Sequence, residues 1–175
     1  MLTGGRSSRM GRDKALLPVD GSAMAARVAD ALRRAGCDPV LAFGGDLRGL
    51  AEVGLPGHPD PRQGDGPLAG LAGALAAVAA DTVVVCACDL PDLAPDDVVA
   101  LLAADRGRGA VAWSDRVEPL CALWPRRAAL TAATALLAAG ERSMRALVDR
   151  LDPQVVPLAA AHLRNVNRPE DLGRD

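Results

Sequence analysis

Glycines and cations crowd the first seventeen residues of the chain, MLTGGRSSRMGRDKALL. Glycine has no Cβ, so its backbone N–H groups can turn toward an approaching oxyanion. The glycines are Gly4, Gly5 and Gly11, and the cations are Arg6, Arg9, Arg12 and Lys14. Backbone donors supply shape and cations supply charge, which is how a chain holds a polyphosphate. The stretch predicts a phosphate-binding loop, and its alternative is a solvated surface loop with scattered charges.

Lys14 is the single lysine in a chain that has nineteen arginines. An ammonium and a guanidinium are not interchangeable on a phosphate, so we expect Lys14 to contact phosphate, with Arg9 as a second catalytic cation. The loop is not a Walker A motif, because that motif ends in Gly-Lys-Ser/Thr and Lys14 is followed by Ala15. It does not match Gly-x-Gly-x-x-Gly either.

Asp89 follows the clearest predicted strand, residues 82–88. The strand is an unbroken apolar run, which is typical of a parallel strand buried on both faces. A carboxylate at its end can hold Mg²⁺ while substrate phosphates and waters fill the other positions. Asp-Leu-Pro is also an ordinary strand-ending turn. The phosphate loop in the same chain favours the metal.

Residues 60–70, DPRQGDGPLAG, combine an acid with a loop that runs into a helix starting near Pro67. The functional interpretation is contact with a nucleoside, in which Asp60 accepts hydrogen bonds from sugar hydroxyls or base amines and Gly66 lies against the nucleotide. The alternative is a simple loop-to-helix cap.

Asn165 and Asn167 are the only asparagines of the chain, and an extended backbone would put both side chains on one face. They are candidates to bind a substrate or to help hold a metal; as turn formers before Pro169 they would need no function. Arg142 is a further candidate for substrate binding, in the stretch Gly140–Arg145, and the alternative there is a helix-capping turn at Ser143.

Strands that alternate with helices must position these groups. We expect strands at 39–43, 57–59, 82–88, 109–113, 120–124 and 155–158, with a turn at 114–116. We expect helices at 23–35 behind a Ser22 cap, then at 47–53, 67–80, from 94 onward, 126–139 and 144–151. This alternation predicts an α/β domain with a mostly parallel sheet. Ligands of such sheets bind at the carboxyl ends of strands near a switch in strand order, where the candidate loops would gather.

Composition narrows the class of protein. The 175 residues suit one domain over 1–175, and a net charge of -2 argues against a general nucleic-acid binder. Four cysteines without a CxxC pair predict reduced thiols in a cytoplasmic protein. No signal peptide and no apolar run of about eighteen residues is present, so no membrane association is expected. Met1–Thr3 is short for a central strand, and we expect the native start to lie a few residues upstream.

Five stretches, in this order along the chain, resemble those of molybdenum cofactor guanylyltransferases, a branch of the small nucleotidyltransferases. They are LTGGRSSRMGRDKALL at 2–17, GPLAG at 66–70, CDLP at 88–91, GER at 140–142 and NVN at 165–167. The resemblance implies a Rossmann-like nucleotidyltransferase fold in a single domain, with GTP, Mg²⁺ and molybdopterin carrying molybdenum. The products would be the guanine dinucleotide cofactor and pyrophosphate, and the partners would be molybdoenzymes or cofactor-delivery proteins.

The resemblance also assigns roles. The nucleotide would be lined by Leu2, Thr3, Gly4, Gly5 and Gly66, its phosphates held by Lys14, its nucleoside by Asp60 and Mg²⁺ by Asp89. Two departures stand out: Thr3 replaces the usual Ala, and Phe43-Gly-Gly occupies a place where relatives often carry Asn for the nucleotide.

Two alternatives to guanylyl transfer stay open at this stage. One is a cytidylyltransferase for the same pterin, or another small nucleotidyltransferase, because base choice depends on a few loop contacts. The other is a non-catalytic domain that binds nucleotide or cofactor and delivers it. Binding alone does not require a metal carboxylate, so Asp89 favours the enzyme.

Overall fold

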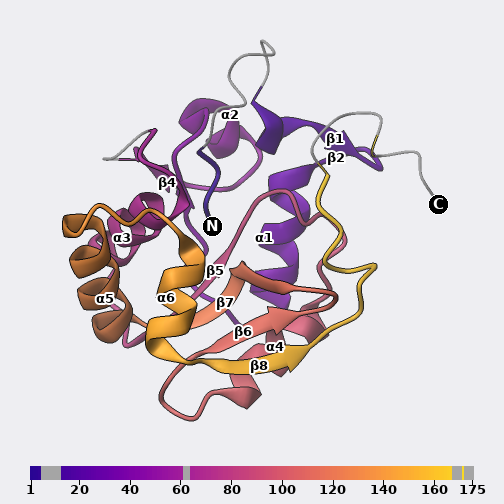
Figure 1. Cartoon of the computed structure of the whole chain (residues 1–175). Coiled ribbons are helices and arrows are strands. Elements are labelled where there is room, and N and C mark those ends of the chain that lie inside the picture. Colours follow the sequence, from indigo (N-terminus) through magenta and orange to yellow (C-terminus); the bar gives the residue numbers. More distant parts are fainter. Residues whose placement is uncertain (5–12, 61–63, 167–170, 172–175) are drawn as a thin grey trace.

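Parallel and antiparallel strands form the centre of the molecule (Figure 1). The computed structural model describes residues 1–4, 13–60, 64–166 and 171. β5, β7, β6 and β8 are hydrogen-bonded in that order, and β3 pairs with β4. Their bounds are β3 Ala42–Phe43, β4 Gly57–His58, β5 Thr82–Cys86, β6 Ala110–Trp113, β7 Val117–Pro125 and β8 Gln154–Pro157.

Leu2 joins the two groups of strands. It bridges in parallel to Phe43 of β3 and to Ala87, just after β5. β7 is antiparallel to β5 and β6, whereas the β3–β4 and β6–β8 pairs are parallel. The expected mostly parallel sheet is confirmed in strand direction, with β7 as the reversed strand that makes it mixed. The predicted turn at 114–116 joins β6 to β7, and so short a connection can join only antiparallel neighbours.

Helices cover both faces of the sheet (Figure 1). One face is covered by α3 (Pro67–Ala77), α5 (Arg126–Ala138) and α6 (Met144–Leu151), and the other by α1 (Met24–Arg34) and α4 (Pro95–Ala104). The helix bounds lie close to those predicted. None of the helices within the described ranges is long and apolar enough to cross a membrane.

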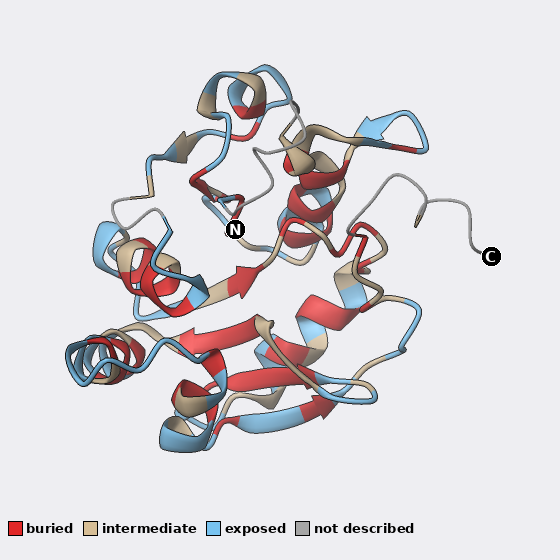
Figure 2. Ribbon diagram, turned by 45° about the horizontal axis from the view of Figure 1, so that its top comes forward, coloured by how far each residue is buried: buried red, intermediate tan, exposed pale blue. Residues whose placement is uncertain are grey.

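Successive residues of each strand point to opposite faces, so the strands contribute side chains to two apolar clusters, one on each face of the sheet. Val85 and Trp124 pack with α3, α5 and α6, while Cys86 and Leu123 pack with α1 and α4. Figure 2 shows the buried residues along the central strands and on the helix faces turned toward them.

The expected Ser22 cap is wrong. Ser22 lies in β2 (Ser22–Ala23), which pairs antiparallel with β1 (Pro18–Val19). The helix α1 follows Ala23, which makes no side-chain cap. The hairpin competes with the cap for the same residues and prevails, because Met24 donates its N–H to Leu17 O at 2.9 Å instead.

Candidate active site

Four neighbouring parallel strands each end in one candidate group. Gly4 follows the strand of residues 1–3, Gly44 follows β3, Asp60 comes shortly after β4, and Asp89 comes shortly after β5. Carboxyl ends of parallel strands meet at one edge of a sheet. The segment of residues 1–3 lies between β3 and β5. The chain forms β3 and β4 on one side of this segment and then β5 on its other side, so this edge is a switch point in strand order.

Lys14 and Asp89 meet at this edge, although 75 positions separate them. Lys14 Nζ donates to Asp89 Oδ2 at 2.8 Å, and the two side chains are 15% and 19% exposed. The lysine stands in a 3-10 turn, Lys14–Leu16, whose first N–H groups are capped by Asp13. The predicted phosphate cation and the predicted metal carboxylate therefore form one partly buried ion pair.

Asn165 adjoins the same carboxylate. In the amide orientation that its surroundings require, Asn165 Nδ2 lies 3.2 Å from Asp89 Oδ1 and 3.3 Å from Oδ2. The N–H of Val166 donates to the main-chain oxygen of Asp89 at 2.9 Å. The structure thus brings together three of the predicted residues, one from each end of the chain and one from its middle.

Cys88, next to Asp89, is no candidate ligand. Burial raises the pKa of its thiol to about 12, and the negative charge of Asp89 adds to that effect. A thiol must lose its proton to bind a metal or act as a nucleophile. The chemistry at this edge is therefore left to oxygen and nitrogen groups.

Glycines allow an unusually close approach beside Asp60. Gly44 has a φ of +84°, and a Cβ on it would lie 2.8 Å from Gly4 Cα and 3.3 Å from Asp60 Cβ. The carboxylate of Asp60 also lies near Gly70 in the first turn of α3, where an added Cβ would be 3.8 Å from Oδ2. The predicted nucleoside acid therefore sits between the start of the phosphate loop and a helix N-terminus. The sequence did not lead us to predict a role for Gly44, although the Gly-Gly pair after a predicted strand was a signal for one.

Thr3, the departure from the usual Ala, is buried. Its Oγ1 lies 2.7 Å from Gly44 O and 3.1 Å from Phe43 O. The hydroxyl therefore links the strand of residues 1–3 to the Gly44 turn.

Asp13 is a positioning group that the sequence reasoning did not assign. Its Oδ1 accepts the N–H of Ala15 at 2.9 Å, and its Oδ2 accepts the N–H of Asp46, the cap of α2 (Leu47–Glu52). This carboxylate holds the Lys14 turn against the start of α2. Its position directly before the single lysine was the available signal.

Arg142 lies in the turn between α5 and α6. Its Nη1 donates to Leu137 O and to Glu141 O, both at 3.0 Å, and Ser143 caps α6 by accepting the N–H of Arg145. The capping turn considered for this stretch is confirmed. These hydrogen bonds hold Arg142 against the end of α5 and its own turn, and its substrate role stays a prediction.

Several predicted residues lie outside the described ranges: Gly5, Arg6, Arg9, Gly11, Arg12 and Asn167. Gly66 is described and confirms the expected helix start, since it has a φ of +89° and precedes Pro67, the first residue of α3. Within the described residues no cluster of three or more His, Cys, Asp or Glu could hold a metal. Leu2 is buried beneath the site, between Phe43 and α3.

The chain is similar to known proteins both in sequence and in fold. A curated molybdenum cofactor guanylyltransferase of Xanthomonas euvesicatoria is 40% identical over 182 residues, which cover 99% of this chain and 91% of the relative. The solved molybdopterin-guanine dinucleotide biosynthesis protein A of Archaeoglobus fulgidus superimposes with a TM-score of 0.72 at 21% identity, over 98% of this chain and 92% of that one. The 2-C-methyl-D-erythritol 4-phosphate cytidylyltransferase of Thermus thermophilus gives 0.72 at 19% identity, over 98% and 93%.

The two solved structures show the fold, which is that of nucleotidyltransferases. The family model described as MobA-like NTP transferase domain matches residues 1–155. With strand ends, glycines and the Lys14–Asp89 pair placed as above, the chain belongs to the family of MobA-like NTP transferase domains.

Proposed function

We propose that the protein transfers GMP from GTP to molybdopterin carrying molybdenum, with release of pyrophosphate. The observation that carries the proposal is the 2.8 Å contact between Lys14 and Asp89 at the switch point of the sheet. The substrates are supported by the Xanthomonas relative, which bears the name molybdenum cofactor guanylyltransferase at 40% identity over nearly the whole chain.

Asp89 is the residue that would hold Mg²⁺. The site offers one partly exposed carboxylate, with the Asn165 amide at its side. This fits Mg²⁺, which proteins commonly bind through one or two carboxylates while substrate phosphates and waters complete the shell. The ion would screen the repulsion between two anionic substrates and polarise the phosphoryl oxygens.

Lys14 and Asp89 would exchange partners when substrates bind. Each neutralises the other in the free protein, so neither charge is left partly buried and unpaired. In the substrate complex Lys14 would turn to the phosphates of GTP. The site then keeps its charge balance, and the ion pair acts as a preformed place for a metal–triphosphate.

The reaction itself needs no covalent enzyme intermediate. The terminal phosphate oxygen of the pterin would attack the α-phosphorus of GTP in line, forming a new P–O bond as the bond to the β-phosphate oxygen breaks. Charge then accumulates on the departing pyrophosphate. Lys14 and the N–H groups of the glycine-rich loop would stabilise that charge, with Arg9 as a further cation.

Asp60 would bind the nucleoside. Its carboxylate lies beside Gly4 and Gly70, where missing Cβ atoms leave room for a ligand to approach the backbone. A carboxylate accepts hydrogen bonds from sugar hydroxyls or from base amines. Phe43-Gly-Gly replaces the Asn that relatives often carry for the nucleotide, so base choice would depend on other loop contacts.

The four cysteines are free thiols, and Cys86 and Cys121 face each other across β5 and β7 without a disulfide. A cytoplasmic location is part of the proposal, and it is supported by the cysteine pattern of the sequence, four cysteines without a CxxC pair.

The test is pyrophosphate release from labelled GTP or CTP, with Mg²⁺ and molybdopterin carrying molybdenum. We expect release with GTP and a guanine dinucleotide product on chromatography. Preferential turnover of CTP would replace the proposal by cytidylyl transfer. Tight nucleotide binding without release of pyrophosphate from either nucleotide would indicate a delivery protein instead.

A further inference from the structure

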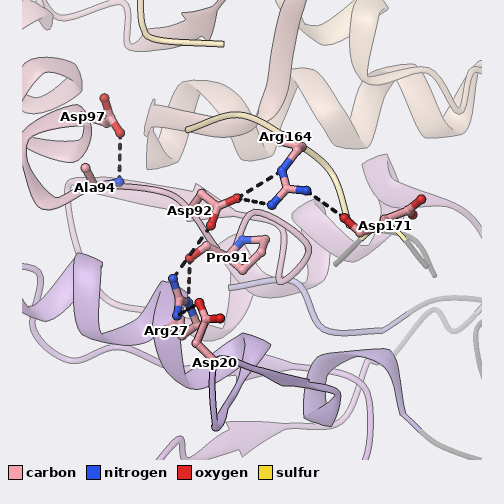
Figure 3. Close-up of polar contacts among 8 residues, drawn as sticks. All are labelled: Asp20, Arg27, Pro91, Asp92, Ala94, Asp97, Arg164 and Asp171. Carbon is pink, nitrogen blue, oxygen red and sulfur yellow. Dashed lines mark hydrogen bonds and ion pairs between the residues drawn. The ribbon is translucent and has the colours of Figure 1, made fainter. Parts of the chain in front are cut away.

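A second carboxylate, Asp92, stands on the turn that follows Asp89 and lies between two arginines from distant parts of the chain (Figure 3). Arg164 donates to Asp92 Oδ2 from Nη2 at 3.0 Å and from Nε at 3.3 Å. Arg27 Nη2 lies 3.8 Å from Asp92 Oδ1. We refer to Arg27, Asp92 and Arg164 as the Asp92 clasp.

The Arg27 end of the clasp fastens the turn to α1. Arg27 Nε donates to the main-chain oxygen of Pro91 at 3.0 Å, and its Nη1 donates to Asp20 Oδ2 at 2.9 Å. Pro91 is buried, so its carbonyl needs a partner within the protein. One guanidinium thus holds both the backbone and the carboxylate of the turn.

At the other end of the clasp, Arg164 holds the segment that follows β8. Its Nη1 donates to the main-chain oxygen of Asp171 at 2.7 Å (Figure 3). The next residue, Asn165, places its amide against both carboxylate oxygens of Asp89, and Val166 donates its N–H to Asp89 O. Asp89 is thus connected to Asp92 along the chain, Asp92 to Arg164 by hydrogen bonds, and Arg164 to Asp89 through the contact of the next residue, Asn165.

The exposure of the three side chains indicates what the clasp contributes. The side chain of Arg27 is 30% exposed, that of Asp92 is 27% exposed and that of Arg164 is 38% exposed. Ion pairs this open to solvent add little to the free energy of unfolding. Two hydrogen bonds from one guanidinium to Asp92 Oδ2 nevertheless restrict the orientation of Arg164, and residues 158–166 include no helix or strand that would hold Asn165 in place.

From this geometry we infer that Asp92 is a positioning residue, which acts through Arg164 to set the Asn165 amide against Asp89. The inference rests on the proposed function for one point, that Asp89 holds the metal of a metal–nucleotide. Outer groups that orient a metal ligand commonly change metal affinity more than they change the fold. The clasp would thus tune how well the site binds Mg²⁺ with nucleotide.

The first test needs no turnover. The chain has only two Asn and two Gln, so the side-chain amide region of a ¹⁵N NMR spectrum holds four NH₂ groups, and Asn165→Ser identifies that of Asn165. We expect Asp92→Ala and Arg164→Met to shift the Asn165 signal and speed its exchange with water. Arg108→Met is the matched control, because it removes an ion pair to Asp152 of 2.6 Å elsewhere in the structure.

The second test is the dependence of turnover on Mg²⁺. We expect Asp92→Ala and Arg164→Met to raise the half-saturating Mg²⁺ concentration roughly tenfold, with kcat at saturating Mg²⁺ within about twofold of wild type. The double variant should resemble the single variants, since both act through one link. Arg108→Met should leave both quantities unchanged.

The outcomes separate the inference from the proposed function. An unchanged Asn165 signal in both variants, or a lower kcat with an unchanged half-saturating Mg²⁺ concentration, overturns the positioning role. If one variant does not fold, the other carries both tests. A wild-type protein without guanylyl transfer defeats the proposed function alone, and the NMR result then still decides whether the clasp positions Asn165.

Discussion

At the scale of single residues, the site is organised by charges that are taken partly out of water. Lys14 and Asp89 each keep less than a fifth of their side-chain surface exposed and lie 2.8 Å apart. A partly buried charge needs a partner, and in the proposed reaction a metal–triphosphate would supply a new partner to each of them. Under that proposal both groups serve one reaction, although they pair with each other in the structure.

Loss of either charge should therefore act on the rate more than on binding. We expect Lys14→Met and Asp89→Asn each to lower kcat on the order of a hundredfold or more, as the loss of transition-state electrostatics commonly does. Pyrophosphate release under saturating substrates measures the effect. Near-normal turnover by both variants would contradict the assigned roles.

Unfolding by urea provides the accompanying control. Each single variant leaves a partly buried charge without its partner and should lose about 1–3 kcal/mol of stability. The double variant removes both charges and should lose less than the sum of the single losses. It should remain as inactive as either of them, which separates catalysis from folding.

At the scale of elements, the turns after strands decide how near a ligand can come. The turn after β3 passes so close to Gly4 that a Cβ on Gly44 would meet backbone atoms at 2.8 Å and 3.0 Å. Backbone atoms cannot rotate away as a side chain can. The turn therefore has to be glycine both for its φ of +84° and for space.

Gly44→Ala should separate these two requirements when it is compared with Gly36→Ala. Gly36 has a similar φ of +90°, but nothing lies within 4 Å of a Cβ there. Gly36→Ala should cost about 1–2 kcal/mol of unfolding free energy for the left-handed backbone alone. Gly44→Ala should cost more in urea unfolding and should also raise KM for GTP. Equal losses and an unchanged KM would show that the close approach does not matter.

At the scale of the whole molecule, two apolar clusters on opposite faces of the sheet carry the fold, and the site lies at the strand ends. The described residues of those clusters are apolar side chains and buried thiols. We therefore expect the metal at the edge of the sheet, where it would contribute to the reaction and not to the stability of the core.

Removal of divalent metal should accordingly stop turnover without loosening the fold. We expect EDTA to abolish pyrophosphate release and to leave Tm, followed by circular dichroism, within about one degree, since ΔΔG near zero gives no shift. Added Mg²⁺ should restore turnover fully. A fall in Tm of several degrees on chelation would instead indicate a structural metal.

Local patterns in the sequence were sufficient for α5, α6 and β5, and for the candidacy of Lys14 and Asp89. Helical periodicity, an unbroken apolar run and the residue types that follow a strand are all properties of short segments. The same reasoning placed Gly66 before the first residue of α3, where a positive φ and a following proline suit a helix start.

Only the tertiary structure decided how those segments meet. The pairing of β7 with β5, the contact of Thr3 with Gly44 and the Asp92 clasp all depend on residues far apart in the chain. Their energies arise when packing brings the partners within hydrogen-bonding distance, and no local preference encodes that meeting. The sequence by itself determined which residues could do the chemistry; the packing of strand ends decided that Lys14, Asp89 and Asn165 lie together.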